Sequence, residues 1–156
     1  MVGEAAGAGG AVTQGGGRRV RIDVWTDLVC PWCYVGQGRL DRAIAEEGVE
    51  VDLVVHSFEL DPRAPHAHTP EAHADGSAPE EAASNIDHLV EAKGMPREQV
   101  LAMEERIGGM AAEIDLPYVQ ERPMANTRAL HRVVQTVAGT IDEAAAAALF
   151  FRIQNG

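Results

Sequence analysis

The chain has 156 residues, two of them cysteine, and its 24 acidic side chains outnumber 13 basic ones for a formal net charge of −11. That length suits one domain. The acidic balance argues against a protein that binds nucleic acid through its phosphates. No apolar run reaches the length of about 18 residues that a membrane span needs. Two cysteines are too few for a disulfide scaffold or a four-cysteine zinc site.

Residues 1–17 are rich in glycine and alanine and contain neither lysine nor arginine. A secretory signal needs a basic start and an unbroken apolar stretch, whereas glycines interrupt this segment throughout. We therefore expect a disordered tail on a cytoplasmic protein.

The next residues follow a strand–helix–strand pattern. Apolar residues alternate with others over 18–25 and again over 49–55, which predicts two strands. Between them, Cys33, Gln37 and two later residues recur at helical spacing, and Gly48 supplies a helix stop. Strand, helix and strand in this order predict a βαβ unit with parallel strands and a right-handed crossover.

The rest of the chain shows a long loop followed by helices. Proline, histidine, alanine and aspartate dominate 61–79, which predicts an exposed loop. Helical patterns then cover 80–93 and the stretch from Pro96 to Pro117, and another begins near Asn126, a suitable N-cap. In that last helix the residues expected to be buried are Leu130, Val133, Val134 and Val137. Thr140 and Glu143 predict a capping box before the final helix.

These patterns divide the chain into four parts: a disordered tail (1–17), an N-terminal α/β part (18–60), a loop (61–79) and a helical block (80–156). The fold class predicted by the sequence is α/β, with a βαβ start and appended helices.

Cys30-Pro31-Trp32-Cys33 carries the clearest chemical signal. A Cys-x-x-Cys pair at a helix start brings both sulfurs to one site, and Pro31 suits the first helical turn. At the N-cap, free backbone N–H groups and the helix dipole favour a Cys30 thiolate. Cys33 lies one turn further on, as a resolving thiol does, so the pair is able to alternate between dithiol and disulfide.

Half of a zinc site is the alternative interpretation of two closely spaced cysteines. It needs two more soft ligands, and the other candidates are His66, His68 and His73 in the distant loop. We expect a solvated loop there and no metal site.

The motif and two further segments resemble one protein family. Residues 27–36 resemble the D-x-x-C-P-W-C-Y-x-G segment of DsbA-like oxidoreductases in the thioredoxin superfamily, and of their cytoplasmic FrnE type above all. Residues 58–62 are similar to that family's F-E-L-D-P, and 126–132 to its N-T-x-x-A-H-R, with Leu130 in place of alanine. The resemblance runs from about residue 20 to residue 150.

The resemblance implies a thioredoxin fold with an α-helical insertion after the first βαβ unit. In the family a closing ββα half follows that insertion and begins at a cis-proline facing the cysteines. None of the eight prolines lies beyond Pro123, and 151–156 look unlike the family's continuation. We therefore expect an incomplete helical block, a missing ββα half and a truncated gene product. A two-stranded sheet leaves an edge unpaired, through which copies of the chain are able to associate.

The activity that the resemblance implies is thiol–disulfide exchange or isomerisation, with Cys30 as nucleophile and Cys33 as resolving cysteine. Its partners are thiol- or disulfide-containing proteins or small molecules, and no cofactor is expected beyond the redox pair and glutathione. Two alternatives stay open. One is an inactive fragment or interaction module. The other is a glutathione-dependent isomerase like the kappa-class transferases, which usually have serine at the first position and lack the second cysteine.

Other residues have both a structural and a functional interpretation. Trp32 and Tyr34 either form apolar walls around the sulfur or pack the helix, and Phe58 either lines the pocket or, as we favour, fills the core. Asn126 and His131 face the active site if they follow the family, and otherwise are an N-cap and a helix-surface histidine. Asp27 caps the turn or tunes Cys30, and we assign it no catalytic role because a carboxylate opposes thiolate formation.

Overall fold

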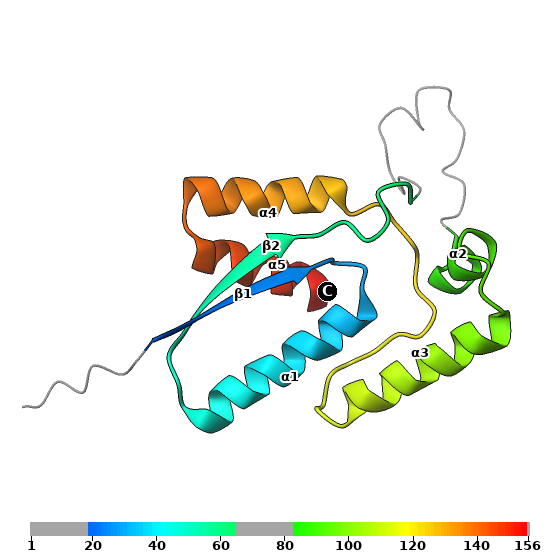
Figure 1. Cartoon of the computed structure of the whole chain (residues 1–156), viewed down its shortest axis with the longest axis horizontal. Coiled ribbons are helices and arrows are strands. Elements are labelled where there is room, and N and C mark those ends of the chain that lie inside the picture. Colours follow the sequence, from blue (N-terminus) through cyan, green and yellow to red (C-terminus); the bar gives the residue numbers. More distant parts are fainter. Residues whose placement is uncertain (1–18, 65–82, 156) are drawn as a thin grey trace, which may run out of the picture.

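The computed structural model of the chain describes residues 19–64 and 83–155. The predicted tail, the three loop histidines and most of the predicted loop therefore lie outside the described residues. Within the described ranges the elements follow in the order β1 (Val20–Thr26), α1 (Pro31–Glu47), β2 (Val51–Ser57), α2 (Asn85–Glu91), α3 (Arg97–Ala112), α4 (Arg128–Thr140) and α5 (Glu143–Asn155) (Figure 1).

The two strands confirm the predicted βαβ unit. They are parallel, with a register that runs from Val20 opposite Val51 to Thr26 opposite Ser57. The second strand begins two residues later than the sequence pattern indicated, and Val49 lies before it with an exposed side chain. Because the strands are parallel, their carboxyl ends lie at the same end of the sheet, and the chain enters α1 from that end.

Helix α1 has a defined signal at each end. Cys30 is the N-cap with an extended backbone, and Pro31 takes the first helical position, where a missing N–H costs no hydrogen bond. Gly48 ends the helix in the left-handed conformation at φ +61°, and its N–H donates to the Ile44 carbonyl at 3.0 Å. Both boundaries agree with the sequence prediction.

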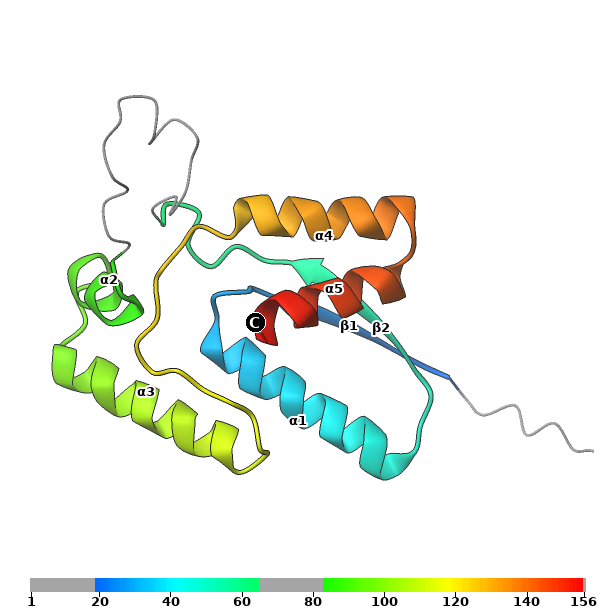
Figure 2. The same cartoon turned by 180° about the vertical axis from the view of Figure 1, so that it is seen from behind.

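Helices cover the sheet from the C-terminal part of the chain. Figure 2 shows α5 lying across the two strands, with α4 beside it. Phe150 of α5 is fully buried and packs with Val55 of β2 and Val134 of α4. A second cluster joins α1 to α3 through Val35, Ile107 and Ala111. Helices from the second half of the chain thus pack against the βαβ unit at two places.

Two local predictions in the last helices are wrong. Leu130 and Val133 are 41% and 51% exposed because α4 turns His131 and Val134 toward the core instead. The capping box of Thr140 does not form: its hydroxyl donates to the Thr136 carbonyl at 2.7 Å. Asp142 caps α5 in its place and accepts the Ala145 N–H at 2.7 Å. Among the described helices, none combines the length and apolar character needed to cross a membrane.

Candidate functional site

The two cysteines occupy the first turn of α1, at the end of the sheet where the carboxyl ends of both strands lie. The Cys33 N–H donates to the Cys30 sulfur at 3.4 Å, so Cys30 serves as a side-chain N-cap. The Cys30 carbonyl accepts the Tyr34 N–H at 3.1 Å and begins the regular helical ladder. Both thiols are partly exposed and neither is in a disulfide. The predicted N-cap position of Cys30 is confirmed.

The sulfurs lie close enough to share a hydrogen bond. That bond lowers the pKa of Cys33 to about 6, and the same bond, with burial, raises the pKa of Cys30. A thiol hydrogen rotates toward either sulfur, so the first proton to leave belongs to the pair and leaves more readily than from an isolated cysteine. The backbone N–H groups of Trp32 and Cys33 act the other way on Cys30 and favour its thiolate.

Cavities lie on two sides of Cys30. One has a volume of about 330 Å³ and the other about 240 Å³, and Val29, Cys30, Pro31 and Arg122 line both. Cys33 is among the lining residues of neither. A molecule held in either cavity therefore meets Cys30 and not Cys33.

The smaller cavity is strongly apolar. It lies between the start of α1 and the pair α2–α3, and its apolar lining consists of Trp32, Leu60, Leu89, Met95, Met103 and Met124. Methionine side chains are flexible and adapt to ligands of different shape. At its edge Lys93 forms an ion pair with Asp61 at 2.7 Å, and His88 contacts the same carboxylate at 2.9 Å.

The larger cavity has a different lining. Tyr34 and Ile153 contribute to it, with the segment that precedes α4. The Tyr34 hydroxyl donates to the Pro117 carbonyl at 2.9 Å, which fixes the ring at the cavity wall. Trp32 thus lines the smaller cavity and Tyr34 the larger one.

A buried polar network holds Arg122, one of the four residues that line both cavities. Arg122 forms an ion pair with Glu104 at 2.9 Å, and Glu104 is only 1% exposed. Asn85 and Tyr118 donate to the same carboxylate. Since every oxygen of Glu104 has a donor, the network holds α2, α3 and the segment before α4 in one arrangement around the cavities.

A second buried carboxylate lies in the segment between β1 and the cysteines. Asp27 follows β1 and is 1% exposed. Its side chain accepts three hydrogen bonds, from the Leu60 N–H at 2.8 Å, the Thr127 hydroxyl at 2.7 Å and His131 Nε2 at 3.0 Å. Burial alone raises the pKa of Asp27, but the bonds from His131, Leu60 and Thr127 outweigh it, and the pKa is lowered.

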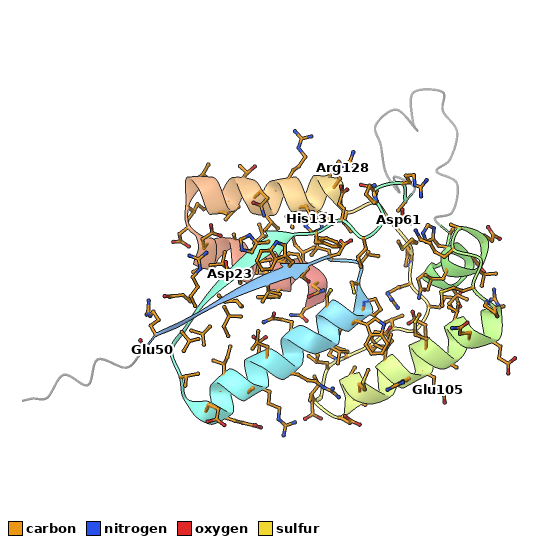
Figure 3. All side chains as sticks on the ribbon, viewed as in Figure 1. Asp23, Glu50, Asp61, Glu105, Arg128 and His131 are labelled. Atoms are coloured by element: carbon orange, nitrogen blue, oxygen red, sulfur yellow. The ribbon has the colours of Figure 1, made fainter. Side chains whose placement is uncertain are left out.

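Three predicted pocket residues do not line the two cavities beside Cys30. Phe58 is 53% exposed and fills neither the pocket nor the core. Asn126 donates to the Pro62 carbonyl at 3.2 Å and accepts the Arg128 N–H at 3.0 Å, so it fixes the chain before α4. His131 is buried against Asp27, and Figure 3 places it between α4 and the strands.

Several residues of the site escaped sequence reasoning. Met103, Glu104 and Arg122 reach the cavities through packing of α3 and an irregular segment, and no spacing in the sequence joins them to the cysteines. Asp27 lies three residues before Cys30 in the sequence, but Thr127 and His131, which bind its side chain, lie 100 and 104 positions further along. Among the described residues, no three histidine, cysteine or acidic side chains gather as a metal site.

Comparisons with known proteins agree on the family. The model of the DSBA-like thioredoxin domain matches residues 21–156. The chain is also similar to a protein of known crystal structure, described as a probable DsbA oxidoreductase from Streptomyces coelicolor. The two sequences are 32% identical, and the structures match with a TM-score of 0.56. The match covers 83% of this chain and 52% of that one. The chain therefore spans about half the length of that structure. A comparison with curated proteins found no match.

The βαβ unit, the cysteines at the start of its helix and the helices that cover it define a thioredoxin-like fold of the α/β class, as the sequence predicted. The chain belongs to the family of DSBA-like thioredoxin domains. The protein of the matching crystal structure is described as a probable oxidoreductase.

Proposed function

We propose that the chain carries out thiol–disulfide exchange through Cys30 and Cys33. The observation that carries the proposal is the position of Cys30: it caps the 17-residue helix α1, and its sulfur accepts the Cys33 N–H at 3.4 Å. A helix N-terminus stabilises a thiolate, which is the reactive form of cysteine. Cys30 also lines two cavities, so an incoming disulfide reaches it first.

In this mechanism the Cys30 thiolate attacks one sulfur of a substrate disulfide. The substrate S–S bond breaks, one substrate thiolate leaves, and a mixed disulfide joins Cys30 to the other substrate sulfur. Cys33 then loses its proton and attacks the Cys30 sulfur, which expels the second substrate thiolate. The substrate gains two electrons and the protein holds a Cys30–Cys33 disulfide. The reverse sequence oxidises a substrate dithiol. If a different thiolate of the same substrate attacks the substrate sulfur of the mixed disulfide, the bond to Cys30 breaks, the Cys30 thiolate leaves, and the substrate keeps a rearranged disulfide.

The cavities support proteins and small thiols as substrates. The apolar side chains of the smaller cavity, such as Met95 and Met103, suit an apolar segment beside a substrate cysteine. The larger cavity, of about 330 Å³, has room for a small thiol such as glutathione on the other side of the sulfur. We further propose the FrnE type and a cytoplasmic location, where the Cys30–Cys33 disulfide is transient. No cofactor beyond the cysteine pair enters the proposed reaction.

The experiment is to compare Cys30→Ser and Cys33→Ser proteins with the wild type. Each is treated with glutathione disulfide, and the adduct is identified by intact mass. Cys33→Ser should accumulate a stable mixed disulfide on Cys30, whereas the wild type should pass through it to the internal disulfide. The alkylation rate of Cys30 should titrate below the ordinary thiol pKa of about 8.5.

The same measurements separate the alternatives. Slow labelling of both cysteines with an ordinary pH profile contradicts the redox proposal and favours an inactive fragment or interaction module. Tight glutathione binding that survives in Cys33→Ser without any covalent adduct favours a glutathione-dependent isomerase.

A further inference from the structure

One edge of β1 has no strand beside it in the part of the chain that the structure describes (Figure 1). Hydrogen bonds at both ends of β1 fix which of its residues face β2. The Val20 N–H donates to the carbonyl just before β2, and the Thr26 carbonyl accepts the N–H just after it. In a parallel ladder the residues in phase with these two also face β2, so Arg21, Asp23 and Trp25 direct their backbone groups to the open edge. That edge is therefore able to pair with another extended segment.

The open edge is complementary to itself when two copies of β1 lie antiparallel with Ile22 on the two-fold axis. Arg21 then lies opposite Asp23 of the second copy, and both direct their backbone to this edge, so each such pair exchanges two hydrogen bonds. Val20 opposite Val24, and Ile22 opposite itself, take the intervening positions, where side chains approach most closely. Val20 is 40% exposed and the other two are partly exposed, so a second copy covers apolar surface.

We propose that β1 pairs with β1 of a second copy of this chain, antiparallel and centred on Ile22, so that two copies form a dimer with one continuous sheet. The same edge serves on both copies, so the contact is isologous and closes at the dimer. Because the joined strands run in opposite directions, their carboxyl ends lie far apart. The Cys30–Cys33 pairs that follow those ends therefore lie at opposite ends of the joined sheet and stay separate.

The charges of β1 select both the occupant and the register. Centring the pair on Arg21 places two arginines directly opposite each other, and centring it on Asp23 does the same with two aspartates. Like charges at opposite positions are destabilising, whereas opposite charges are stabilising. A register centred on Ile22 brings opposite charges together at two places. A foreign segment needs the same alternation of arginine, apolar residue and aspartate, which a second copy already has.

Arg21 and Asp23 are prepared for this contact within the single chain. Arg21 binds the Asp23 carboxylate through Nε at 2.9 Å and Nη2 at 2.8 Å, and His56 contacts it at 2.8 Å. The bonds from Arg21 and His56 lower the pKa of Asp23, so the carboxylate is ionised. No contact among the described residues uses Nη1 of Arg21, which remains for the carboxylate of the second copy. The four side chains then alternate in charge and carry no net charge together.

The test begins with sedimentation velocity at roughly 0.15 M salt, which screens the repulsion between two chains of charge −11. A seven-residue strand gives a small interface, so we expect a weak dimer that forms as the concentration rises to about 1 mM. Arg21→Asp places like charges opposite each other at two positions and should weaken association roughly tenfold. Adding Asp23→Arg to it restores opposite charges and should bring the dissociation constant back to within about threefold of the wild type.

Arg39→Asp is the matched control. Arg39 is likewise an exposed arginine that binds a carboxylate, that of Glu113, and it lies on α1. Its replacement changes the net charge by the same amount, so it should leave the dissociation constant within about twofold of the wild type. Circular dichroism establishes that all variants are folded.

NMR of the wild type measures the register without any substitution. Val20 and Val24 lie about 13 Å apart along one strand, too far for a nuclear Overhauser effect within a chain. In the proposed dimer their Hα atoms meet across the two copies, so we expect a cross-peak between them that strengthens with concentration.

A wild type that stays monomeric up to about 1 mM overturns the proposal, and so does assembly beyond the dimer. Equal weakening by Arg21→Asp and Arg39→Asp, or a dimer without the contact between Val20 and Val24, overturns it as well. All of these results leave the proposed thiol–disulfide exchange untouched, because each copy holds its own cysteine pair.

Discussion

The indole of Trp25 stacks on the imidazole of His56, with ring centroids 4.5 Å apart and planes inclined by 17°. The two residues are register partners on β1 and β2, so the stack joins the strands on one face of the sheet. His56 is also held by Asp23 at 2.8 Å. Side chains thus strengthen the contact between two strands whose other edges have no strand beside them in the described residues.

Amide exchange should alternate along β1. The Val20 N–H donates to the carbonyl of Glu50, the residue just before β2, at 2.9 Å. In a parallel ladder every second residue donates to the same partner strand, so Ile22 and Val24 are in phase with Val20. The N–H groups of Arg21 and Asp23 point to the other edge. We expect the amides of Ile22 and Val24 to exchange more slowly than those of Arg21 and Asp23 in hydrogen exchange followed by NMR. Equal protection of the two sets of amides would contradict a free edge at β1. Protection of the Arg21 amide that increases with protein concentration would show that copies of the chain associate through that edge.

Phe150→Ala should destabilise the protein strongly. The ring is fully buried between β2 and α4, and its removal leaves a cavity in the cluster that holds α5 on the sheet. We expect the free energy of unfolding to fall by about 3–5 kcal/mol in urea denaturation. The matched control is Phe58→Ala, in which the same atoms are removed from a half-exposed position, with an expected effect below about 0.5 kcal/mol. Equal losses in the two variants would show that α5 is not packed as described.

Two glycines in α1 should respond oppositely to alanine. Gly36 is exposed and a Cβ there meets no atom within 4 Å. Gly36→Ala should therefore raise the free energy of unfolding by about 0.5–1 kcal/mol, the helix propensity gained. At Gly38 a Cβ collides with Leu116 and comes within 3.1 Å of Ile114. Gly38→Ala should be destabilising in the same thermal or urea measurement, and stabilisation by both substitutions would contradict the contact between α1 and the segment after α3.

Asp61 should contribute to acid sensitivity. The hydrogen bonds from Lys93 and His88 lower the pKa of Asp61 from 3.8 to about 2. A carboxyl whose pKa is lower in the folded state stabilises the protein above its unfolded pKa and loses that contribution as the pH falls through the folded value. The unfolding free energy of the wild type should therefore decline between about pH 4 and pH 2 more steeply than that of Asp61→Asn. Parallel dependences of the unfolding free energy on pH in the two proteins would show that the ion pair of Asp61 with Lys93 has no effect on stability.

Trp32→Ala should change which disulfides react. The ring lines the apolar cavity beside Cys30, so its loss should slow reduction of a peptide disulfide with apolar flanking residues several-fold. Reaction with glutathione disulfide, which has no large apolar group, should change less. Trp25→Ala is the matched control, because Trp25 is exposed on β1 and lines neither cavity beside Cys30. An equal effect of both substitutions, or none, contradicts a role of the cavity in substrate choice.

Sequence reasoning succeeded where the determinants are local. Alternating apolar residues, Pro31 at the first helical position and Gly48 at the stop predicted β1, α1 and β2, because each signal acts within one or two turns of chain. The N-cap role of Cys30 followed from the same spacing. The resemblance added the family, which the comparisons confirm. The division of the chain into tail, α/β part, loop and helical block stays a prediction.

The errors arose where packing chooses between equivalent local patterns. Leu130 has helical spacing with both Val133 and Val134, yet α4 turns the face of His131 inward because that face meets Asp27 and Phe150. A buried polar pair of this kind has no signature in hydrophobic periodicity. The smaller cavity depends on how α2 and α3 pack beside α1, and the larger one on how the segment after α3 and the end of α5 pack there. Single-sequence patterns specify neither arrangement.

The hydrogen bonds of Asp27 to Thr127 and His131 join residues 100 and 104 positions apart. Contacts of such long range form late in folding, since the intervening chain must be ordered first. During synthesis, the cysteines therefore leave the ribosome well before the α4 residues that complete their surroundings. A nascent chain that ends before Thr127 contains both cysteines but lacks Thr127 and His131, two of the donors that hold the Asp27 carboxylate in the folded protein.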